Sequence, residues 1–207
     1  MCCTGAICRE SVFTEESLCA EFKVSRSPVR EALQMLADRR LVEKTPRQGY
    51  VVRQLNLTEI HELYELRLVL ETYIMEQVCK TGMDESTLAT LKRRWAQVYE
   101  ALPEMIADPV TVDENFHQAL ASAVGNQAMV DMLSNIDARI RFVRMFDITN
   151  AERLKATCLQ HLETLEAIER RDAGKAIDVL RRNIEDGRIQ AENAVKEALA
   201  SAHAIYG

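Results

Sequence analysis

The stretch Val24–Leu36 reads V-S-R-S-P-V-R-E-A-L-Q-M-L and decides how the amino-terminal part of the chain folds. Its apolar residues recur at helical spacing, which predicts a short helix with one buried face: Val29, Leu33 and Leu36. Either Ser25 or Ser27 supplies the capping oxygen, and Pro28 fits within the first turn, where a missing N–H leaves no carbonyl unpaired. We therefore expect a helix that begins at this serine and proline.

Two arginines lie on another face of this helix. Arg26 and Arg30 are four residues apart, beside Ser27 and Gln34. A helix start that exposes two guanidinium groups and small polar side chains suits a DNA major groove. The same pattern also fits a capped surface helix with two solvated arginines, so the flanking sequence has to decide.

The flanks predict a winged helix-turn-helix. Thr14–Phe22 (T-E-E-S-L-C-A-E-F) is typical of a preceding short helix capped by Thr14. After Leu36, two short β-branched runs surround the turn Thr45–Gly49 (T-P-R-Q-G), which predicts a hairpin. Helix, tight turn, helix and a hairpin with a basic tip form this class of DNA-binding domain.

The runs V-S-R-S-P-V-R-E-A-L-Q-M-L and L-V-E-K-T-P-R-Q-G-Y-V-V strongly resemble the GntR family of bacterial transcription regulators. The resemblance implies DNA contacts at the start of the second helix and at the wing tip, by Ser25, Arg26, Ser27, Pro28, Arg30, Arg47, Gln48 and Gly49. Lys23 stands where the family usually has glycine. The family's domain opens with one more helix, and few residues precede Thr14, so we expect a winged domain that is missing its first helix.

Composition bounds the rest of the chain. Two modest domains are expected for 207 residues, and we place them at 1–55 and 56–207. Apolar residues make up 47%, while glycine and proline are few, which predicts a mainly α-helical protein. Residues 1–55 carry nine Lys/Arg and seven Asp/Glu, a charge of +2, so the remainder carries −8 of the total of −6. This asymmetry favours a small DNA reader joined to an acidic domain.

Localisation is predicted from what the sequence lacks. It has no run of about 20 apolar residues and no secretory leader, so we expect a cytoplasmic protein without a membrane partner. The six cysteines show neither zinc-finger nor redox-pair spacing, and we expect them to be reduced thiols.

Apolar residues at spacings of three and four predict an all-α, six-helix bundle after the wing. On the first of these helices we expect a buried stripe of Ile60, Leu63, Leu66, Leu70, Ile74 and Val78. On the fourth of these helices we expect a second buried stripe, formed by Met129, Met132, Leu133, Ile136, Ile140 and Val143. The first helix is expected to end near Lys80, and the others to span about 84–102, 108–125, 127–146, 151–170 and 173–203.

Asp113 and His117, in D-E-N-F-H, lie four residues apart and project from one helix face, a spacing that can chelate a metal. His161 lies among apolar neighbours on a later helix. A carboxylate with two imidazoles suits a transition metal. From spacing alone, the favoured interpretation is a surface pair of Asp113 and His117 with a separate, hydrogen-bonded and partly buried His161.

Residues 57–200 resemble the ligand-sensing FCD domain that follows the winged helix in the FadR branch of the GntR family, through E-L-Y-E-L-R-L-V-L-E, D-E-N-F-H-Q-A-L-A-S-A-V-G-N and Q-H-L-E-T-L-E-A-I-E-R-R-D. Many members bind a divalent metal through one Asp and three His. Asp113, His117 and His161 match the first three ligands, but R-R-N-I-E places Asn183 at the fourth, and its amide is a poorer ligand. The resemblance implies zinc, nickel or manganese at a site that is weakened or is completed by water or effector, and a metal-free site is the further alternative.

Effectors of this family are mostly small organic acids or acyl thioesters, and arginine is the natural partner of a buried carboxylate. The candidate effector-binding residues are Arg67, Arg139 and Arg144, with Arg141 as a further candidate. Arg67 alternatively forms a surface pair with Glu71, one turn away.

The sequence thus predicts a homodimeric transcription regulator that binds double-stranded operator DNA under the control of a small carboxylate-type effector. Two alternatives are a metal-dependent helical enzyme using Asp113, His117 and His161, and a ligand-sensing bundle that has lost autonomous DNA binding. The enzyme alternative lacks an evident nucleophile, and it leaves the winged pattern unexplained.

Overall fold

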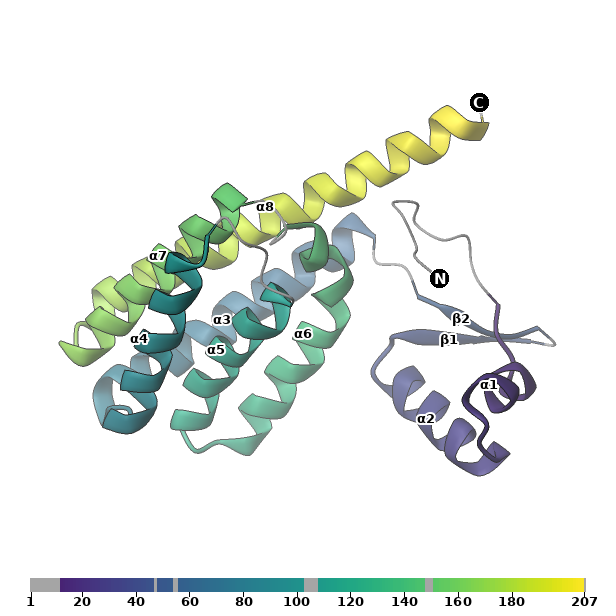
Figure 1. Ribbon diagram of the computed structural model, residues 1–207, viewed down its shortest axis with the longest axis horizontal. Helices are drawn as coiled ribbons and strands as arrows, with labels where there is room; N and C mark the ends of the chain where they lie inside the picture. Colours follow the sequence, from purple (N-terminus) through teal and green to yellow (C-terminus); the bar gives the residue numbers. More distant parts are fainter. Residues whose placement is uncertain (1–11, 47, 54–55, 103–107, 148–150, 207) are drawn as a thin grey trace. The chain divides into compact units, whose positions relative to one another are not determined.

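The computed structural model describes residues 12–46, 48–53, 56–102, 108–147 and 151–206 (Figure 1). The backbone forms two compact units that meet in the sequence at Leu57. The amino-terminal unit contains two short helices and a hairpin, and the other contains the remaining helices of the described chain. The protein is therefore mainly α-helical, as predicted. The expected absence of a further helix before Thr14 concerns residues 1–11, which lie outside the described part.

The amino-terminal unit is built from α1 (Glu15–Phe22), α2 (Arg26–Asp38), β1 (Val42–Thr45) and β2 (Gly49–Val52). The two strands are antiparallel, with Val42 opposite Val52 and Thr45 opposite Gly49. Phe13 extends this pairing, because its N–H and carbonyl both bond to Tyr50. The small core of the unit consists of Val29, Leu33, Val42 and Tyr50. These elements form the predicted helix-turn-helix and wing.

The turn between α1 and α2 depends on local backbone chemistry. Thr14 and Ser17 form a capping box at the start of α1, which satisfies N–H groups of the first turn. Lys23 ends α1 in the left-handed conformation (φ 55°) and its N–H bonds to the Cys19 carbonyl, although glycine adopts this conformation with less strain. Ser25 is the N-cap of α2, but its side chain makes no capping bond.

The end of α2 differs from expectation. Val29 and Leu33 are buried, whereas Leu36 is 37% exposed. The prediction that Leu36 is buried with them is therefore wrong. The residues of α2 that pack in the small core are Val29, Leu33 and Ala37, which are four residues apart, and Leu36 lies beside this face of the helix.

The second unit, Leu57–Glu197, consists of α3 (Leu57–Thr81), α4 (Glu85–Glu100), α5 (Pro109–Ala123), α6 (Gln127–Asp147), α7 (Ala151–Glu169) and, as far as Glu197, α8 (Ala173–Tyr206). Their bounds agree with the predicted ones to within a few residues. Asp84 and Asp108 cap α4 and α5 by accepting bonds from Thr87 and Thr111. In the packed bundle, α4 lies against α7, α5 lies against α6, and α3 contacts α5, α6 and α7.

The stripe predicted on α3 is buried at Ile60, Leu63, Ile74 and Val78, but the prediction is wrong for Leu66, which is 44% exposed. Arg67 and Glu71, which were not part of the stripe, are buried at 3% and 2%. On α6, Met132 of the predicted stripe is likewise half exposed. Burial of Arg67 and Glu71 is possible because each finds a charged partner inside the bundle. The interior of this unit is therefore partly ionic.

None of the helices in the described part of the chain is long and apolar enough to cross a bilayer.

Candidate functional site

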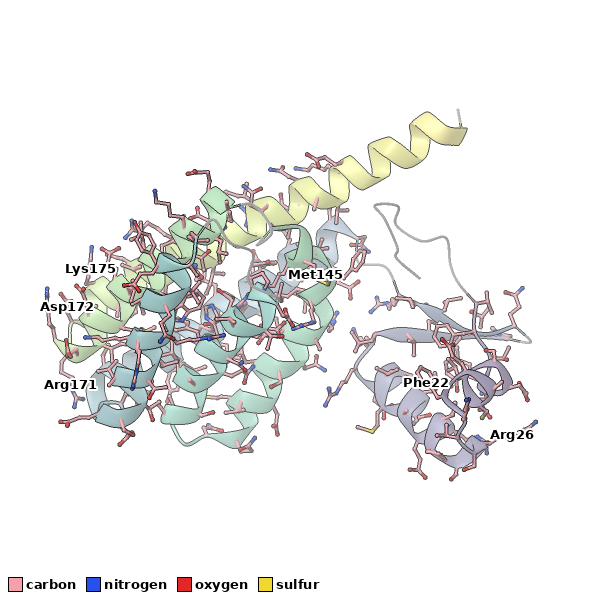
Figure 2. The ribbon with its side chains drawn as sticks, viewed as in Figure 1. Phe22, Arg26, Met145, Arg171, Asp172 and Lys175 are labelled. Carbon is pink, nitrogen blue, oxygen red and sulfur yellow. The ribbon has the colours of Figure 1, made fainter. Side chains whose placement is uncertain are left out.

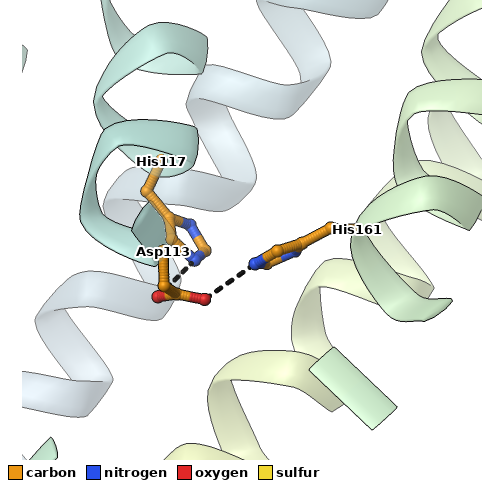
Figure 3. Close-up of side chains that lie close together, drawn as sticks. All are labelled: Asp113, His117 and His161. Carbon is orange, nitrogen blue, oxygen red and sulfur yellow. Dashed lines mark hydrogen bonds and ion pairs between the residues drawn. The ribbon is translucent and has the colours of Figure 1, made fainter. Parts of the chain in front are cut away.

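Asp113, His117 and His161 come together inside the helical unit. The first two lie one turn apart on α5, and His161 reaches them from α7 (Figure 3). His161 Nε2 is 2.7 Å from Asp113 Oδ1, and His117 Nε2 is 3.5 Å from Asp113 Oδ2. The three possible ligand atoms all lie within 4.8 Å of one another, and all three residues are buried. The alternative of a surface pair with a separate histidine is not the arrangement found.

Aromatic packing holds His161 in place. Its ring stacks on Phe116 at 3.8 Å between centroids and meets the edge of Trp95 at 4.4 Å. Burial lowers the pKa of His161 to about 4, although Asp113 acts in the opposite direction. His161 is therefore neutral at physiological pH, which is the protonation state that binds metal.

His117 is oriented by a carboxylate behind it. Its Nδ1 contacts Glu71 Oε2, while its Nε2 is buried without a hydrogen-bond partner and faces Asp113. Burial opposes ionisation of Glu71, but His117 and Arg67 outweigh it and hold the pKa of Glu71 at about 2. A carboxylate that fixes the far nitrogen of an imidazole is the usual support of a metal-binding histidine.

These residues fit a divalent transition metal. The unpaired Nε2 of His117, the neutral ring of His161 and the carboxylate of Asp113 supply three donors of suitable chemistry. Asn183 of α8 is buried, and its side-chain N–H donates to Gln160 Oε1 at 2.8 Å. This bond occupies Nδ2, whereas Oδ1 is the atom of Asn183 that could bind a metal.

Two arginines surround Asp137 beside the three possible metal ligands. Arg144 forms an ion pair with Asp113, and its Nη1 lies 3.5 Å from Asp137 Oδ1. Arg67 donates to Glu71 at 2.6 Å, and its Nη1 lies 3.9 Å from Asp137. Arg67 Nη2 and Arg144 Nη1 are buried without a hydrogen-bond partner. Both guanidinium groups therefore retain N–H donors that an anion would satisfy.

Other arginines of α6 lie nearer the surface. Arg139 pairs with Glu59 and is 14% exposed at its side chain, and Arg141 pairs with Glu114 and Asp108. Of the candidates for effector binding, the structure thus brings Arg67 and Arg144 to the three possible metal ligands and pairs Arg139 with Glu59.

Sequence reasoning missed the contributions of Asp137 and Trp95, and it considered Glu71 only in the alternative in which Arg67 lies at the surface. A signal was present for Asp137, because it lies four residues after Leu133 and three before Ile140, in register with the buried face of α6. A charged residue in such a register needs a buried partner. Trp95 gives no comparable signal, since its contact with His161 joins two helices that are distant in sequence.

The proposed DNA-facing residues are exposed. The side chains of Arg26 and Arg30 are each 66% accessible, and Figure 2 shows Arg26 extending outward from the beginning of α2. Glu16 of α1 contacts Arg26 at 3.2 Å, and Glu15 accepts two bonds from Arg30. The set also includes Ser25, Ser27 and Pro28 on the exposed face of α2, with Gln48 exposed in the wing.

Gly49 cannot be replaced without strain at the wing. Its φ is +117°, and a Cβ there would lie 2.4 Å from the Phe13 carbonyl oxygen. Close backbone approach at the base of the wing therefore requires glycine. Arg47, the other predicted wing-tip contact, lies outside the described residues.

Burial of His161 predicts a pH-dependent stability. A pKa lowered from 6.5 to about 4 means that the unfolded chain binds a proton that the folded chain does not. The free energy of unfolding should therefore fall as the pH decreases from about 6.5 to about 4, with a contribution on the order of 3 kcal/mol. In urea titrations, His161→Gln should show a shallower fall over this range. Equal slopes for both proteins would contradict the assignment.

Each of the two units matches a known protein family. Residues 62–186 match the FCD domain, and residues 4–52 match the bacterial regulatory proteins of the gntR family. The Nta operon transcriptional regulator of Aminobacter aminovorans is 30% identical over 158 residues, which cover 76% of this chain and 74% of that protein.

Solved structures share the fold. Escherichia coli McbR/YncC superposes with a TM-score of 0.78 at 16% identity, covering 89% of this chain and 88% of that one. The Zn²⁺-bound FCD domain of the regulator TM0439 superposes with a TM-score of 0.57 at 22% identity, covering 69% and 98%. The chain belongs to the GntR family of bacterial transcription regulators, in the branch whose winged helix-turn-helix is followed by an FCD domain.

Proposed function

We propose that this regulator binds operator DNA as a homodimer and that a small carboxylate, held with a divalent metal inside the helical unit, controls its affinity. The DNA contacts are assigned to the exposed start of α2 and to the wing, with Arg26 and Arg30 in the major groove. Such a protein acts in the cytoplasm, where operator DNA is found. Its relatives are named as regulators, which favours this function over a metal-dependent enzyme.

The observation that carries the ligand proposal is the unbalanced charge of the buried residues. Around the two histidines, Arg67 and Arg144 contribute two positive charges and Glu71, Asp113 and Asp137 contribute three negative ones, a sum of −1 that leaves out Glu59 because it pairs with Arg139. A histidine binds a metal in its neutral form, so the histidines add no charge to this sum in the metal-bound state. Buried net charge is costly unless it is compensated. A divalent cation held by Asp113, His117 and His161 would supply two positive charges.

With that cation the same set carries +1, and a single carboxylate would neutralise it. Arg67 Nη2 and Arg144 Nη1 are buried, have no hydrogen-bond partner and would donate to its oxygens. Arg139 is paired with Glu59 and could bind the carboxylate only after that ion pair is broken. A monocarboxylate or a weakly charged organic acid therefore suits the interior better than a neutral ligand.

An exposed apolar stripe on α3 supports a homodimer. Leu66, Val69 and Tyr73 are 44%, 70% and 46% exposed and recur at spacings of three and four, so they share one helix face. Large apolar side chains that line up on a surface commonly mark a protein contact. Two-fold symmetry would also place two copies of α2 on a symmetric operator.

Selection from a random duplex library, followed by native mass spectrometry of the protein, tests this function. We expect an enriched inverted repeat with half-sites separated by about one helical turn, roughly 34–36 Å. The purified protein should be a dimer that retains a metal ion and a small acid. Failure to enrich any sequence, or a monomer that binds one isolated half-site, would contradict the proposal.

A further inference from the structure

We propose that Glu15 is a positioning residue for DNA recognition: its carboxylate holds the Arg30 guanidinium so that the free edge of the guanidinium reads a base. The inference rests on the proposed DNA-binding role of α2 and adds a residue from the preceding helix. Arg30 is then not a freely solvated side chain, because Glu15 fixes its orientation before DNA binds.

The contact between the two side chains is bidentate. Arg30 Nε donates to Glu15 Oε1 at 3.3 Å, and Arg30 Nη2 donates to Glu15 Oε2 at 3.0 Å. The Glu15 side chain is 21% exposed, whereas that of Arg30 is 66% exposed. The hydrogen bond from Arg30 is also the largest influence that lowers the pKa of Glu15. The carboxylate is thus the partly covered member of the pair, and the guanidinium faces outward.

Glu15 stands on a fixed support. It is the first residue of α1, directly after Thr14, whose capping box with Ser17 defines the helix start. Leu18 and Cys19 of the same helix pack on the core around Val29 and Leu33. A carboxylate at this point also lies at the positive end of the helix, where negative charge is favoured.

The remaining donors of Arg30 suit a guanine. A guanidinium has five N–H donors, and the contact with Glu15 uses one from Nε and one from Nη2. The edge formed by Nη1 and the second Nη2 hydrogen is left for the O6 and N7 acceptors of guanine. Holding the long side chain in one rotamer reduces the entropy lost when this contact forms.

The neighbouring pair of Glu16 and Arg26 provides a contrast. It consists of one contact of 3.2 Å between side chains that are 64% and 66% exposed. Such a pair is weak and does not fix an orientation. Glu16 should act mainly as a negative charge that competes with DNA phosphate for Arg26. Glu16→Gln is therefore a matched control for Glu15→Gln, with the same charge change one residue away.

The test compares the affinity of each variant for the duplex selected by the wild-type protein with its affinity for a scrambled duplex of the same composition, at fixed salt. Glu15→Gln should lower the ratio of specific to nonspecific affinity by about tenfold while leaving nonspecific binding unchanged or stronger. Glu16→Gln should strengthen binding to both duplexes in parallel. Arg30→Lys should lower the ratio by itself, and adding Glu15→Gln to it should have little further effect.

Three results would overturn the inference. One is a parallel increase for both duplexes in Glu15→Gln, which would make Glu15 a simple repulsive charge. Another is that Glu15→Gln and Arg30→Lys lower the ratio of specific to nonspecific affinity independently, so that their effects add in full in the double variant. A third is a lower ratio that disappears when the variants are compared at equal folded fraction, measured by thermal unfolding. If the wild-type protein itself does not distinguish the duplexes, the proposed function fails and the inference fails with it, a result distinct from a failure confined to Glu15.

Discussion

Alanine at both Arg26 and Arg30 should weaken binding to the selected operator by about 30-fold or more at fixed salt. Each arginine is two-thirds exposed at the start of α2, and an arginine that contacts a base or phosphate contributes roughly 1–3 kcal/mol. The substitution also leaves Glu15 and Glu16 without cations, so repulsion of DNA adds to the loss. Fluorescence anisotropy over a series of salt concentrations measures the affinity and the number of counterions released.

The control for this prediction is the pair Arg93→Ala and Arg94→Ala. Both residues are exposed on α4, so the double variant has the same change of net charge in the other unit. We expect its operator affinity to stay within about threefold of wild type, since distant charges are screened by salt. Equal losses in the two double variants would show that overall charge, and not the α2 face, determines DNA binding.

Asp113→Asn should lower the free energy of unfolding by about 3 kcal/mol or more and abolish stabilisation by metal. Asp113 pairs with buried Arg144 and faces both histidines, so its loss removes the closest carboxylate of a buried guanidinium and leaves Asp137, at 3.5 Å, as its partner. Burial opposes ionisation of Asp113, but Arg144 and His117 outweigh it and hold its pKa well below the usual value. Urea unfolding measures the loss.

The same experiment with Zn²⁺ separates the two roles of Asp113. A metal at 100 times its dissociation constant should stabilise the wild-type protein by about 2.7 kcal/mol and leave Asp113→Asn unchanged. Glu163→Gln is the control, because its exposed pairs with Lys175 and Arg182 should contribute within about 1 kcal/mol. Equal stabilisation of wild type and Asp113→Asn by Zn²⁺ would place the metal elsewhere.

Local chemistry made most of the fold predictable. Thr14, Asp84 and Asp108 each cap the helix that follows, and the spacing of apolar residues gives the extent of the helices to within a few residues. It was harder to predict which residues of a helix face the core. Leu66 and Arg67 are adjacent in the middle of α3, and the structure buries the arginine and exposes the leucine, although the apolar residues at both ends of the predicted stripe are buried. Hydrophobicity alone favours the wrong choice here.

The metal-ligand set was predictable in part. Asp113 and His117 share a face because of their spacing, but nothing in the spacing brings His161 of α7 to them, and its placement followed from the family resemblance. Asp137 lies near Arg144 of its own helix and near Arg67 of α3. Its register on α6 indicates that it is buried, but its contact with α3 depends on tertiary packing that a single sequence does not contain. Arg30 was predicted as a DNA contact, while its carboxylate partner on α1 required the structure.

The central claim, that a ligand in the helical unit sets the affinity of the winged unit for DNA, is tested most directly by one titration. Binding of the selected operator is measured by anisotropy at fixed salt, without addition and with Zn²⁺ together with each member of a panel of small carboxylates. A ligand that raises the thermal unfolding temperature should change the operator Kd by about fivefold or more. If such a ligand leaves the Kd within about twofold, the two units are not coupled and the account is contradicted.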